Sequence, residues 1–195
     1  MTPEREAKLK KVLNNRQSGL VVVLENVHDI HNISAVIRTC DAVGVQDMFV
    51  LNNVIQRHAR FGYNSAASAL KWITVHQFED TAACFAALRQ RCDKIYATHL
   101  GTASASLYDI DLTERVALVF GNEKDGVTDG CLAMCDGNFV IPQAGMVQSL
   151  NISVACAISL YEAYRQRRLA GMYDDTPKLP ETQWKELAKQ WKMYE

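Results

Sequence analysis

The side chains most able to do chemistry in this sequence lie in three polar stretches. They are residues 25–38, residues 121–126 and residues 141–153, and each directly follows an apolar run. In open α/β sheets, ligands bind beyond the carboxyl ends of the strands. We therefore treat the three stretches as parts of one candidate site.

The first stretch contains an arginine in apolar surroundings. Arg38 follows Ile37 and precedes Cys40 by two positions on an expected helix. A charged residue among apolar neighbours is usually paired or functional, and a guanidinium suits phosphate or carboxylate recognition. Asn32 or Ser34 can cap the start of this helix. That structural role accounts for the asparagine but not for the arginine.

The second and third stretches each have a structural and a functional interpretation. Gly121 and Gly126 bracket a turn, but no Lys-Ser/Thr pair follows, so this is not a Walker loop. In the third stretch, Ser149 and Asn151 lie at the start of a long helix. Exposed N–H groups and the positive end of the helix dipole point outward there. This end is either a simple cap or part of a cradle for an adenosyl or carboxylate group.

The elements that must position these stretches alternate along the chain. We expect strands at residues 20–24, 48–51, 72–75, 94–97, 116–120 and 139–141. We expect helices at residues 3–15, 33–43, 81–88, 127–134, 150–169 and 181–193, with Gly44 and Gly171 closing two of them. This alternation predicts an α/β fold, with a mostly parallel sheet covered by helices on both faces.

Composition limits the class of protein. The 195 residues suit one compact domain with short appendages, and 48% of them are hydrophobic. No apolar run is long enough to span a bilayer, and the charged start of the chain lacks the features of a signal peptide, so we expect a cytoplasmic protein without a membrane partner. The six cysteines have no ligand spacing, which favours reduced, buried thiols and no metal site.

The net charge of −1 does not indicate a nucleic-acid-binding protein, although basic residues cluster near both ends of the chain. On charge alone, solvated helix faces explain these clusters better than an RNA surface does. The clustered side chains include Arg5, Lys8, Lys11, Arg16, Arg165 and Arg167.

The three stretches, taken in order, resemble the signature motifs of the SPOUT superfamily of trefoil-knotted RNA methyltransferases. More narrowly, they resemble its tRNA (guanosine 2′-O)-methyltransferase branch. The resemblance is carried by NVHDIHNISAVIRTCDAVGV, GNEKDGV, GMVQSLNISVA and YEAYRQRRLAGMY. It implies a deep C-terminal trefoil knot, a rare exception to normal chain connections that periodicity does not reveal. It also implies a basic N-terminal helix (1–17), a methyltransferase domain (18–172) and a C-terminal helical extension (173–195).

The resemblance implies a site for S-adenosylmethionine and no metal. It assigns the donor to Thr98, His99, Leu100, Gly121, Ile141, Met146, Ser149 and Leu150. It assigns the reaction to Arg38, Asn32, Glu123, Ser149 and Asn151. It further implies a homodimer with the active site at the subunit interface, where Arg38 reaches the donor site of the partner chain. Because a guanidinium stays protonated, we expect Arg38 to bind ribose and phosphate and to stabilise the developing alkoxide.

The activity implied is methylation of the ribose 2′-hydroxyl of guanosine 18 in the D-loop of tRNA. The clustered basic side chains named above are then expected to grip tRNA. Two alternatives stay open: methylation of another tRNA position or of ribosomal RNA, and a non-catalytic RNA-binding relative. Asp125, Gln143 and Ala144 depart from the family pattern, which leaves the exact substrate preference open.

Overall fold

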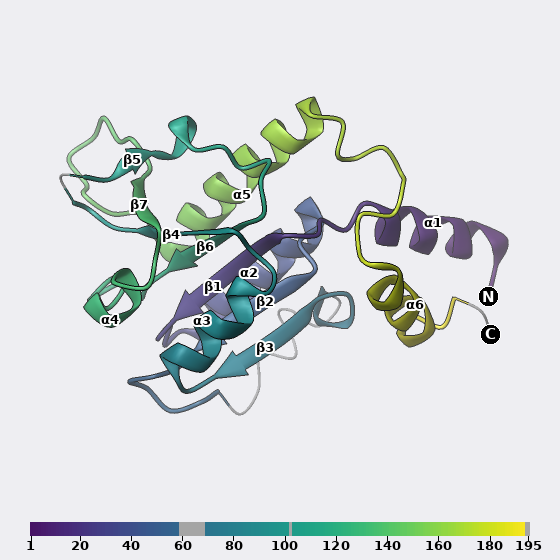
Figure 1. The fold of residues 1–195 in the computed structure, drawn as a ribbon, viewed down its shortest axis with the longest axis horizontal. Helices are drawn as coiled ribbons and strands as arrows, with labels where there is room; N and C mark the ends of the chain where they lie inside the picture. The colour runs from purple at the N-terminus through teal and green to yellow at the C-terminus, as the bar shows by residue number, and fades with distance from the viewer. Residues whose placement is uncertain (59–68, 102, 194–195) are drawn as a thin grey trace.

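A single parallel β-sheet forms the centre of the molecule (Figure 1). The computed structural model describes residues 1–58, 69–101 and 103–193. Within them, seven strands lie in the order β3-β2-β1-β6-β4-β7-β5, and all neighbours are parallel. Their bounds are β1 Leu20–Glu25, β2 Asp47–Leu51, β3 Thr74–Phe78, β4 Lys94–Thr98, β5 Ala105–Ser106, β6 Val116–Phe120 and β7 Gly137–Val140.

Helices cover both faces of this sheet, which confirms the predicted fold class. On one face α2 (Ile30–Val43) and α5 (Ile152–Leu169) pack on alternate strand residues such as Val22 and Leu118. On the other face, α3 (Thr81–Arg89) and α4 (Asp129–Leu132) share a core with the intervening residues. Burial on both faces explains why the central strands are uninterrupted apolar runs.

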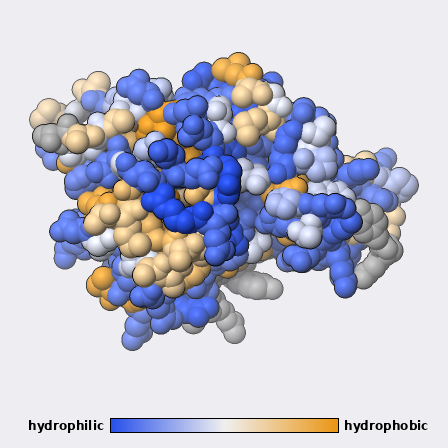
Figure 2. All heavy atoms as spheres, in the orientation of Figure 1, coloured by the Kyte–Doolittle hydropathy of each residue, from blue (hydrophilic) through white to orange (hydrophobic). Residues whose placement is uncertain are grey.

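The first and last helices form a separate small core. Figure 1 shows α1 (Pro3–Asn14) and α6 (Glu181–Gln190) side by side at one end of the molecule. Leu13 of α1 packs in one cluster with Leu187 and Trp191, and Trp72 packs against that cluster. Over these two helices, the face in Figure 2 is largely hydrophilic. No helix among the described residues is both long and apolar enough to cross a membrane.

Several expected boundaries differ from the structure for identifiable reasons. Helix α2 begins at Ile30 rather than at residue 33, because the Asp29 side chain accepts from His31 N and caps it. The expected strand at 72–75 is displaced into β3, after a short 3-10 helix at Ala69–Lys71. The expected helix at 127–134 shrinks to α4. The strand β5 and the 3-10 helix Leu107–Asp109 were not predicted.

Two expected helix ends are confirmed. Gly44 lies directly after α2 with a φ of 83°, the left-handed conformation that glycine adopts without strain. Gly171 lies one residue beyond the C-cap of α5, with a φ of 73°, and its N–H donates to the carbonyl of Arg168. Both helices therefore stop where the glycines predict.

Candidate active site

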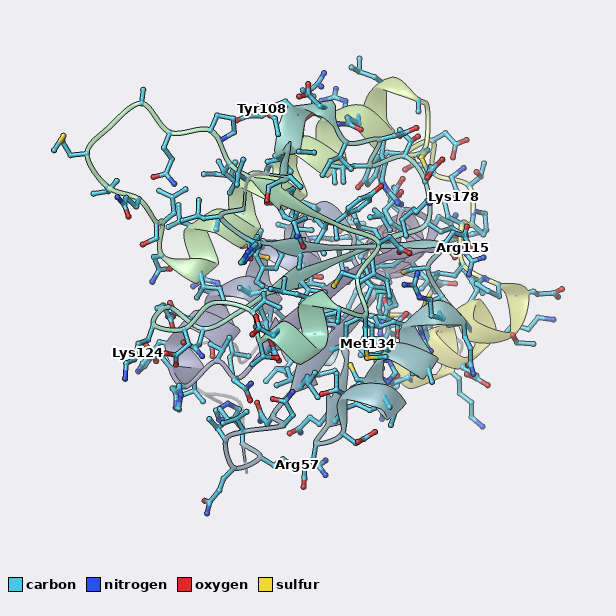
Figure 3. All side chains as sticks on the ribbon, turned by 60° about the vertical axis from the view of Figure 1, so that its left-hand side comes forward. Arg57, Tyr108, Arg115, Lys124, Met134 and Lys178 are labelled. Carbon is cyan, nitrogen blue, oxygen red and sulfur yellow. The ribbon has the colours of Figure 1, made fainter. Side chains whose placement is uncertain are left out.

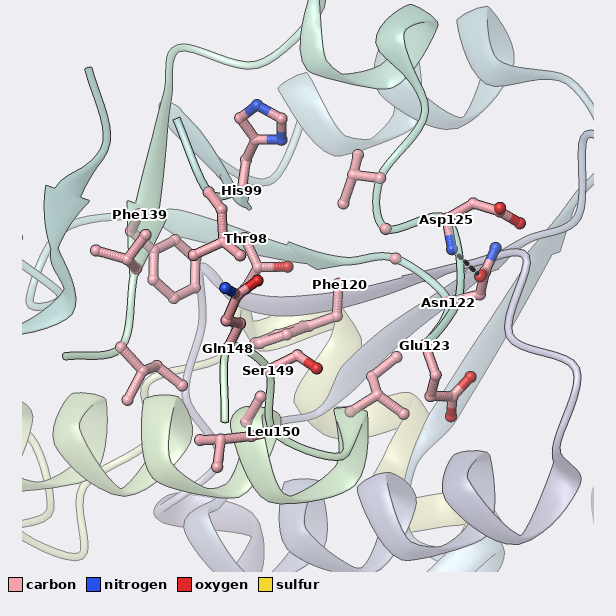
Figure 4. A pocket seen from close by; sticks show the side chains of 18 of the residues that line it. Thr98, His99, Phe120, Asn122, Glu123, Asp125, Phe139, Gln148, Ser149 and Leu150 are labelled. Carbon is pink, nitrogen blue, oxygen red and sulfur yellow. Dashed lines mark hydrogen bonds between the residues drawn. The ribbon is translucent and has the colours of Figure 1, made fainter. Parts of the chain in front are cut away.

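The carboxyl ends of β4, β6 and β7 open into one pocket of about 420 Å³ (Figure 4). Its lining comes from three loops, at residues 98–100, 120–127 and 139–150, and from the start of α5. Apolar side chains such as Phe120, Phe139 and Leu150 form part of the wall. The two later polar stretches of the sequence therefore meet around the same cavity.

The loop after β6 is held in shape by close backbone packing. A Cβ atom at Gly121 would overlap the backbone of Gly126 and Val127, so only glycine fits. Gly126 has a φ of 71°, a conformation that L side chains rarely adopt. The Asn122 side-chain oxygen accepts from Lys124 N at 2.9 Å and from Asp125 N at 2.8 Å, the second of which is dashed in Figure 4. These contacts fix the backbone conformation of the turn.

A chain of hydrogen bonds joins all three polar stretches. The Asn32 amide donates to Oε1 of Glu123, and the Asn151 amide donates to Oδ1 of Asn32 at 3.2 Å. Oδ1 of Asn151 accepts from both N and Oγ of Ser153, at 2.9 and 2.6 Å. Because the backbone N–H of Ser153 can only donate, the Asn151 amide must direct its NH₂ group toward Asn32. Neither amide is free to flip.

This arrangement changes the structural role that Asn32 was expected to have. The cap of α2 is Asp29, so Asn32 lies inside the first turn and its side chain is available to Glu123. The side chain of Asn151 has two roles: it caps α5, as expected, and its amide also donates to Asn32. Ser34 is buried, and its hydroxyl has no partner among the described residues.

Arg38 is not brought into the pocket of its own chain. Its side chain lies on the exposed side of α2, and it makes no hydrogen bond or ion pair with any described residue. It is also absent from the pocket lining, which includes no residue of α2. The pocket and Arg38 of one chain therefore do not form a single site by themselves.

Seven of the eight residues expected to hold the donor line the pocket. These are Thr98, His99, Leu100, Gly121, Ile141, Ser149 and Leu150. The exception is Met146, which is 99% exposed at the outer part of the loop between β7 and α5. The structure places Met146 outside the cavity.

The six basic side chains expected to contact tRNA divide into two groups. Arg5, Lys8 and Lys11 are exposed on α1, and Lys11 lies 3.6 Å from Asp175. Arg165 is exposed on α5, where it forms a bidentate pair with Glu162 at 2.8 Å per bond. These four side chains are on the surface, where a phosphate can reach them.

Arg16 and Arg167 are fully buried, which contradicts their expected contact with RNA. Arg16 pairs with Asp41 at 2.6 Å and lies over the Trp191 ring. Arg167 donates to the backbone carbonyls of Leu112 and Glu114, and burial lowers the pKa of its guanidinium to about 10. The hydrogen bonds of both guanidinium groups join segments that are distant in sequence, because a buried charge needs partners inside the protein.

Glu25 begins the first polar stretch, but sequence reasoning gave it no role of its own. It ends β1 and has no solvent exposure. Its oxygens accept from Thr128 N at 2.9 Å, from Thr128 Oγ1 at 2.6 Å and from Asn53 Nδ2 at 3.2 Å. It thereby fixes the far end of the pocket loop against the central strand. The available signal was a carboxylate that directly ends an apolar strand, because such a charge needs buried partners.

The cysteines are free thiols, as expected. Five are buried and Cys135 is half-buried. Burial raises the pKa of Cys40, Cys84, Cys92 and Cys135 to about 12 in each case. No group of three or more metal-ligating side chains gathers within residues 1–58, 69–101 and 103–193.

Comparison with known proteins gives consistent matches. Residues 19–161 match the SpoU rRNA Methylase family. The chain is 43% identical over 187 residues to a tRNA (guanosine(18)-2′-O)-methyltransferase of Thermus thermophilus, covering 96% of this chain and 95% of that protein. The solved structure of an A. aeolicus TrmH/SpoU tRNA modifying enzyme superposes with a TM-score of 0.87 at 37% identity, covering 96% and 94% of the two chains.

A second solved structure contains a bound ligand. It is an AdoMet-bound rRNA methyltransferase of Sinorhizobium meliloti, which is 26% identical to this chain. The TM-score is 0.68, and the match covers 80% of this chain and 59% of that one.

Proposed function

Because the chain belongs to the SpoU methylase family, we propose that it transfers a methyl group from S-adenosylmethionine to the ribose 2′-oxygen of guanosine 18 in tRNA. Relatives that carry this activity in their names match 96% of the chain at 37–43% identity. The structural observation that carries the proposal is the hydrogen-bonded chain from Ser153 to Glu123. It joins the three polar stretches at the edge of a single pocket.

The pocket fits the methyl donor. A volume of about 420 Å³ lies within the range of small-molecule sites. The aromatic walls of Phe120 and Phe139 suit an adenine ring, and Asp125 in the same lining supplies a negative charge for the cationic donor. The donor supplies a methyl group that the positive sulfur already makes electrophilic. A metal ion is therefore not needed for this chemistry.

The reaction is largely a problem of positioning. The ribose oxygen must be aligned with the methyl carbon, so that a C–O bond forms as the C–S bond breaks and its electron pair stays on sulfur. The hydroxyl proton leaves to phosphate or water. In this proposal Asn32, Glu123, Ser149 and Asn151 shape the ribose side of the pocket, with Asn32 and Asn151 locked by their mutual hydrogen bond.

Arg38 completes the site from a second copy of the chain. It remains protonated, and it binds the ribose and neighbouring phosphate while stabilising the charge that develops on oxygen. Its position outside its own pocket and its lack of partners among the described residues support a homodimer with shared active sites. The exposed cations of α1 and Arg165 then extend the tRNA surface.

The proposal also includes a knotted C-terminal segment within residues 18–172, flanked by helical extensions at 1–17 and 173–195. The strand order fits a knot, because β6 lies between β1 and β4, and β7 lies between β4 and β5, although each comes later in the sequence than both of its neighbours. A cytoplasmic location follows from the tRNA substrate that the relatives' names give.

The test is a methylation assay with radiolabelled donor and unmodified tRNA, mapped by nuclease digestion. We expect label at guanosine 18 and none in a transcript with adenosine at that position. Label in ribosomal RNA alone would overturn the tRNA assignment. Bound donor without label in any RNA would instead identify a binding protein.

Replacing Arg38 tests the shared site. We expect Arg38→Ala to lower kcat by about 100-fold or more, because one charge-stabilising donor is typically worth that much, and to leave donor affinity unchanged. Mixing Arg38→Ala with a donor-site variant such as Gly121→Ala, at a donor concentration too low to fill the weakened Gly121→Ala site, should restore about a quarter of wild-type activity. Half of randomly mixed dimers are heterodimers, and each has one intact site. No recovery after subunit exchange would exclude a contribution from the partner.

A further inference from the structure

Lys124 is the one lysine or arginine among the described residues that line the donor pocket. Two carboxylates flank it, on Glu123 and Asp125. The Lys124 side chain is exposed, and its ammonium makes no hydrogen bond or ion pair with any residue the structure describes. A cation next to two carboxylates that pairs with neither is available to another anion.

The loop geometry explains why the ammonium is left available. The backbone N–H of Lys124 is fixed by the Asn122 side chain, and the Gly121–Gly126 packing closes the turn beneath it. The Glu123 carboxylate is already engaged by Asn32. Figure 3 shows Lys124 at the outer edge of the molecule, projecting away from the sheet. The backbone is therefore held in place while the side chain extends toward solvent.

The charges of the loop indicate which kind of ligand Lys124 can bind. The loop has a formal charge of −1, from two carboxylates and one ammonium. An RNA strand that places a ribose at this pocket brings its phosphates toward those carboxylates. Without the ammonium the loop would have a charge of −2 and would repel the backbone more strongly. A lysine is a flexible point charge well suited to a phosphate whose exact position is set by other contacts.

We propose that Lys124 binds a phosphate of the RNA strand next to the target ribose and so holds the nucleotide over the pocket. This inference rests on the proposed function, since it assumes an RNA substrate. The other anion that enters the site is the carboxylate of the methyl donor. The exposure of Lys124 at the outer edge of the loop favours the RNA, because the donor fills the cavity behind it.

The test compares Lys124→Gln with Lys94→Gln. Lys94 is an exposed lysine at the first residue of β4, so it lies at the opposite end of the strand from the pocket. We expect Lys124→Gln to raise the KM for tRNA about 5- to 10-fold and to reduce the slope of log K against log salt for tRNA binding by about 0.7–0.9. Lys94→Gln should change neither quantity, and Lys124→Arg should restore both.

Two outcomes would overturn the inference. An unchanged salt slope in Lys124→Gln would show that the ammonium contacts no phosphate. Weaker binding of S-adenosylmethionine in the absence of RNA, with unchanged tRNA binding, would assign the ammonium to the donor carboxylate. Because tRNA binding is measured without turnover, either result is distinct from failure of the proposed function, in which wild-type protein would not methylate tRNA at all.

Discussion

At the scale of single residues, Glu25 is a fully buried carboxylate on which two segments depend. Its oxygens accept both polar hydrogens of Thr128 and one from Asn53. In Glu25→Ala these donors lose their acceptor, and each buried unpaired group costs about 1–3 kcal/mol. We expect the free energy of unfolding to fall by about 3 kcal/mol, measured by urea denaturation.

Glu114 provides the matched control for that measurement. It is exposed, and its side chain makes no hydrogen bond or ion pair with any residue in the described part of the chain. Glu114→Ala should stay within about 0.5 kcal/mol of wild type, as surface substitutions usually do. If Glu25→Ala were equally mild, Glu25 would not hold the loop.

Replacing Gly121 tests a steric role, because the backbone of the pocket loop packs closely against this residue. In Gly121→Ala the new methyl group meets the backbone of Gly126, which cannot move aside as a flexible side chain can. The loop must open, and we expect the dissociation constant of S-adenosylmethionine to rise at least about tenfold, equivalent to about 1.4 kcal/mol. Titration calorimetry measures this directly.

Gly145 controls for the effect of an added methyl group. It lies in the other long loop of the pocket region, and a Cβ there has nothing within 4 Å. Gly145→Ala should leave donor affinity unchanged. Equal losses in the two variants would mean that loop flexibility, rather than packing at Gly121, governs binding.

The sequence identified most of the residues that gather at the pocket, with Met146 as an exception, but not how each is used. Ser149 in the lining, and Asn32 hydrogen-bonded to the lining residue Glu123, were found because polar residues follow apolar strands, and parallel strands end at one edge. The burial of Arg16 and Arg167 was not predictable, because it depends on contacts with segments distant in sequence. Local charge clustering cannot distinguish a surface cation from one enclosed by the fold.

At the scale of elements, Asn151 combines a cap with a link between helices. Its Oδ1 caps α5, and its amide contacts Asn32 on α2. Serine is also a good cap but has no amide. We therefore expect Asn151→Ser to keep the free energy of unfolding within about 0.5 kcal/mol while kcat falls. Asn151→Ala should lose about 1 kcal/mol as well.

Thermal or urea unfolding, combined with methylation kinetics, separates the two roles of Asn151. If Asn151→Ser were as active as wild type, the link to Asn32 would be dispensable and Asn151 would serve only as a cap. If it were inactive and also strongly destabilised, the cap and the link could not be treated as separate contributions.

Strongly periodic elements were predictable, and short ones were not. The strand at 116–120 matches β6 because a buried parallel strand is an unbroken apolar run. Strand β5 has only two residues, Ala105 and Ser106, and so no period to detect. Helix α4 is shorter than expected because Thr128 caps it and Ala133 already ends it.

At the scale of the whole molecule, the cysteines report on global unfolding. A thiol whose pKa is raised to about 12 is almost entirely protonated at pH 8, whereas an unfolded thiol has a pKa near 8.5. We expect very slow reaction with Ellman's reagent in the native protein and rapid reaction of all six thiols in denaturant.

The same shifts predict how stability depends on pH. The folded pKa lies above the unfolded one, so the folded state retains protons that the unfolded state releases. Stability contributed by these thiols is therefore complete below about pH 8 and falls as pH rises from about 9 toward 12. Denaturation at pH 7 and pH 10 tests this, and equal midpoints would contradict it. Cys135, which is half-buried, should be the first thiol modified.

The position of β6 has a consequence for how the chain is made. Leu20 lies beside Val116 and Lys94 lies beside the same residue, so the strand that unites β1 and β4 emerges from the ribosome after both. Until then each has an open edge, which is a template for aggregation. Folding during translation must wait for residues 116–120, and the pocket must wait for α5. A chain that terminates before α5 therefore lacks part of the pocket lining, and one that terminates before β6 keeps both strand edges open.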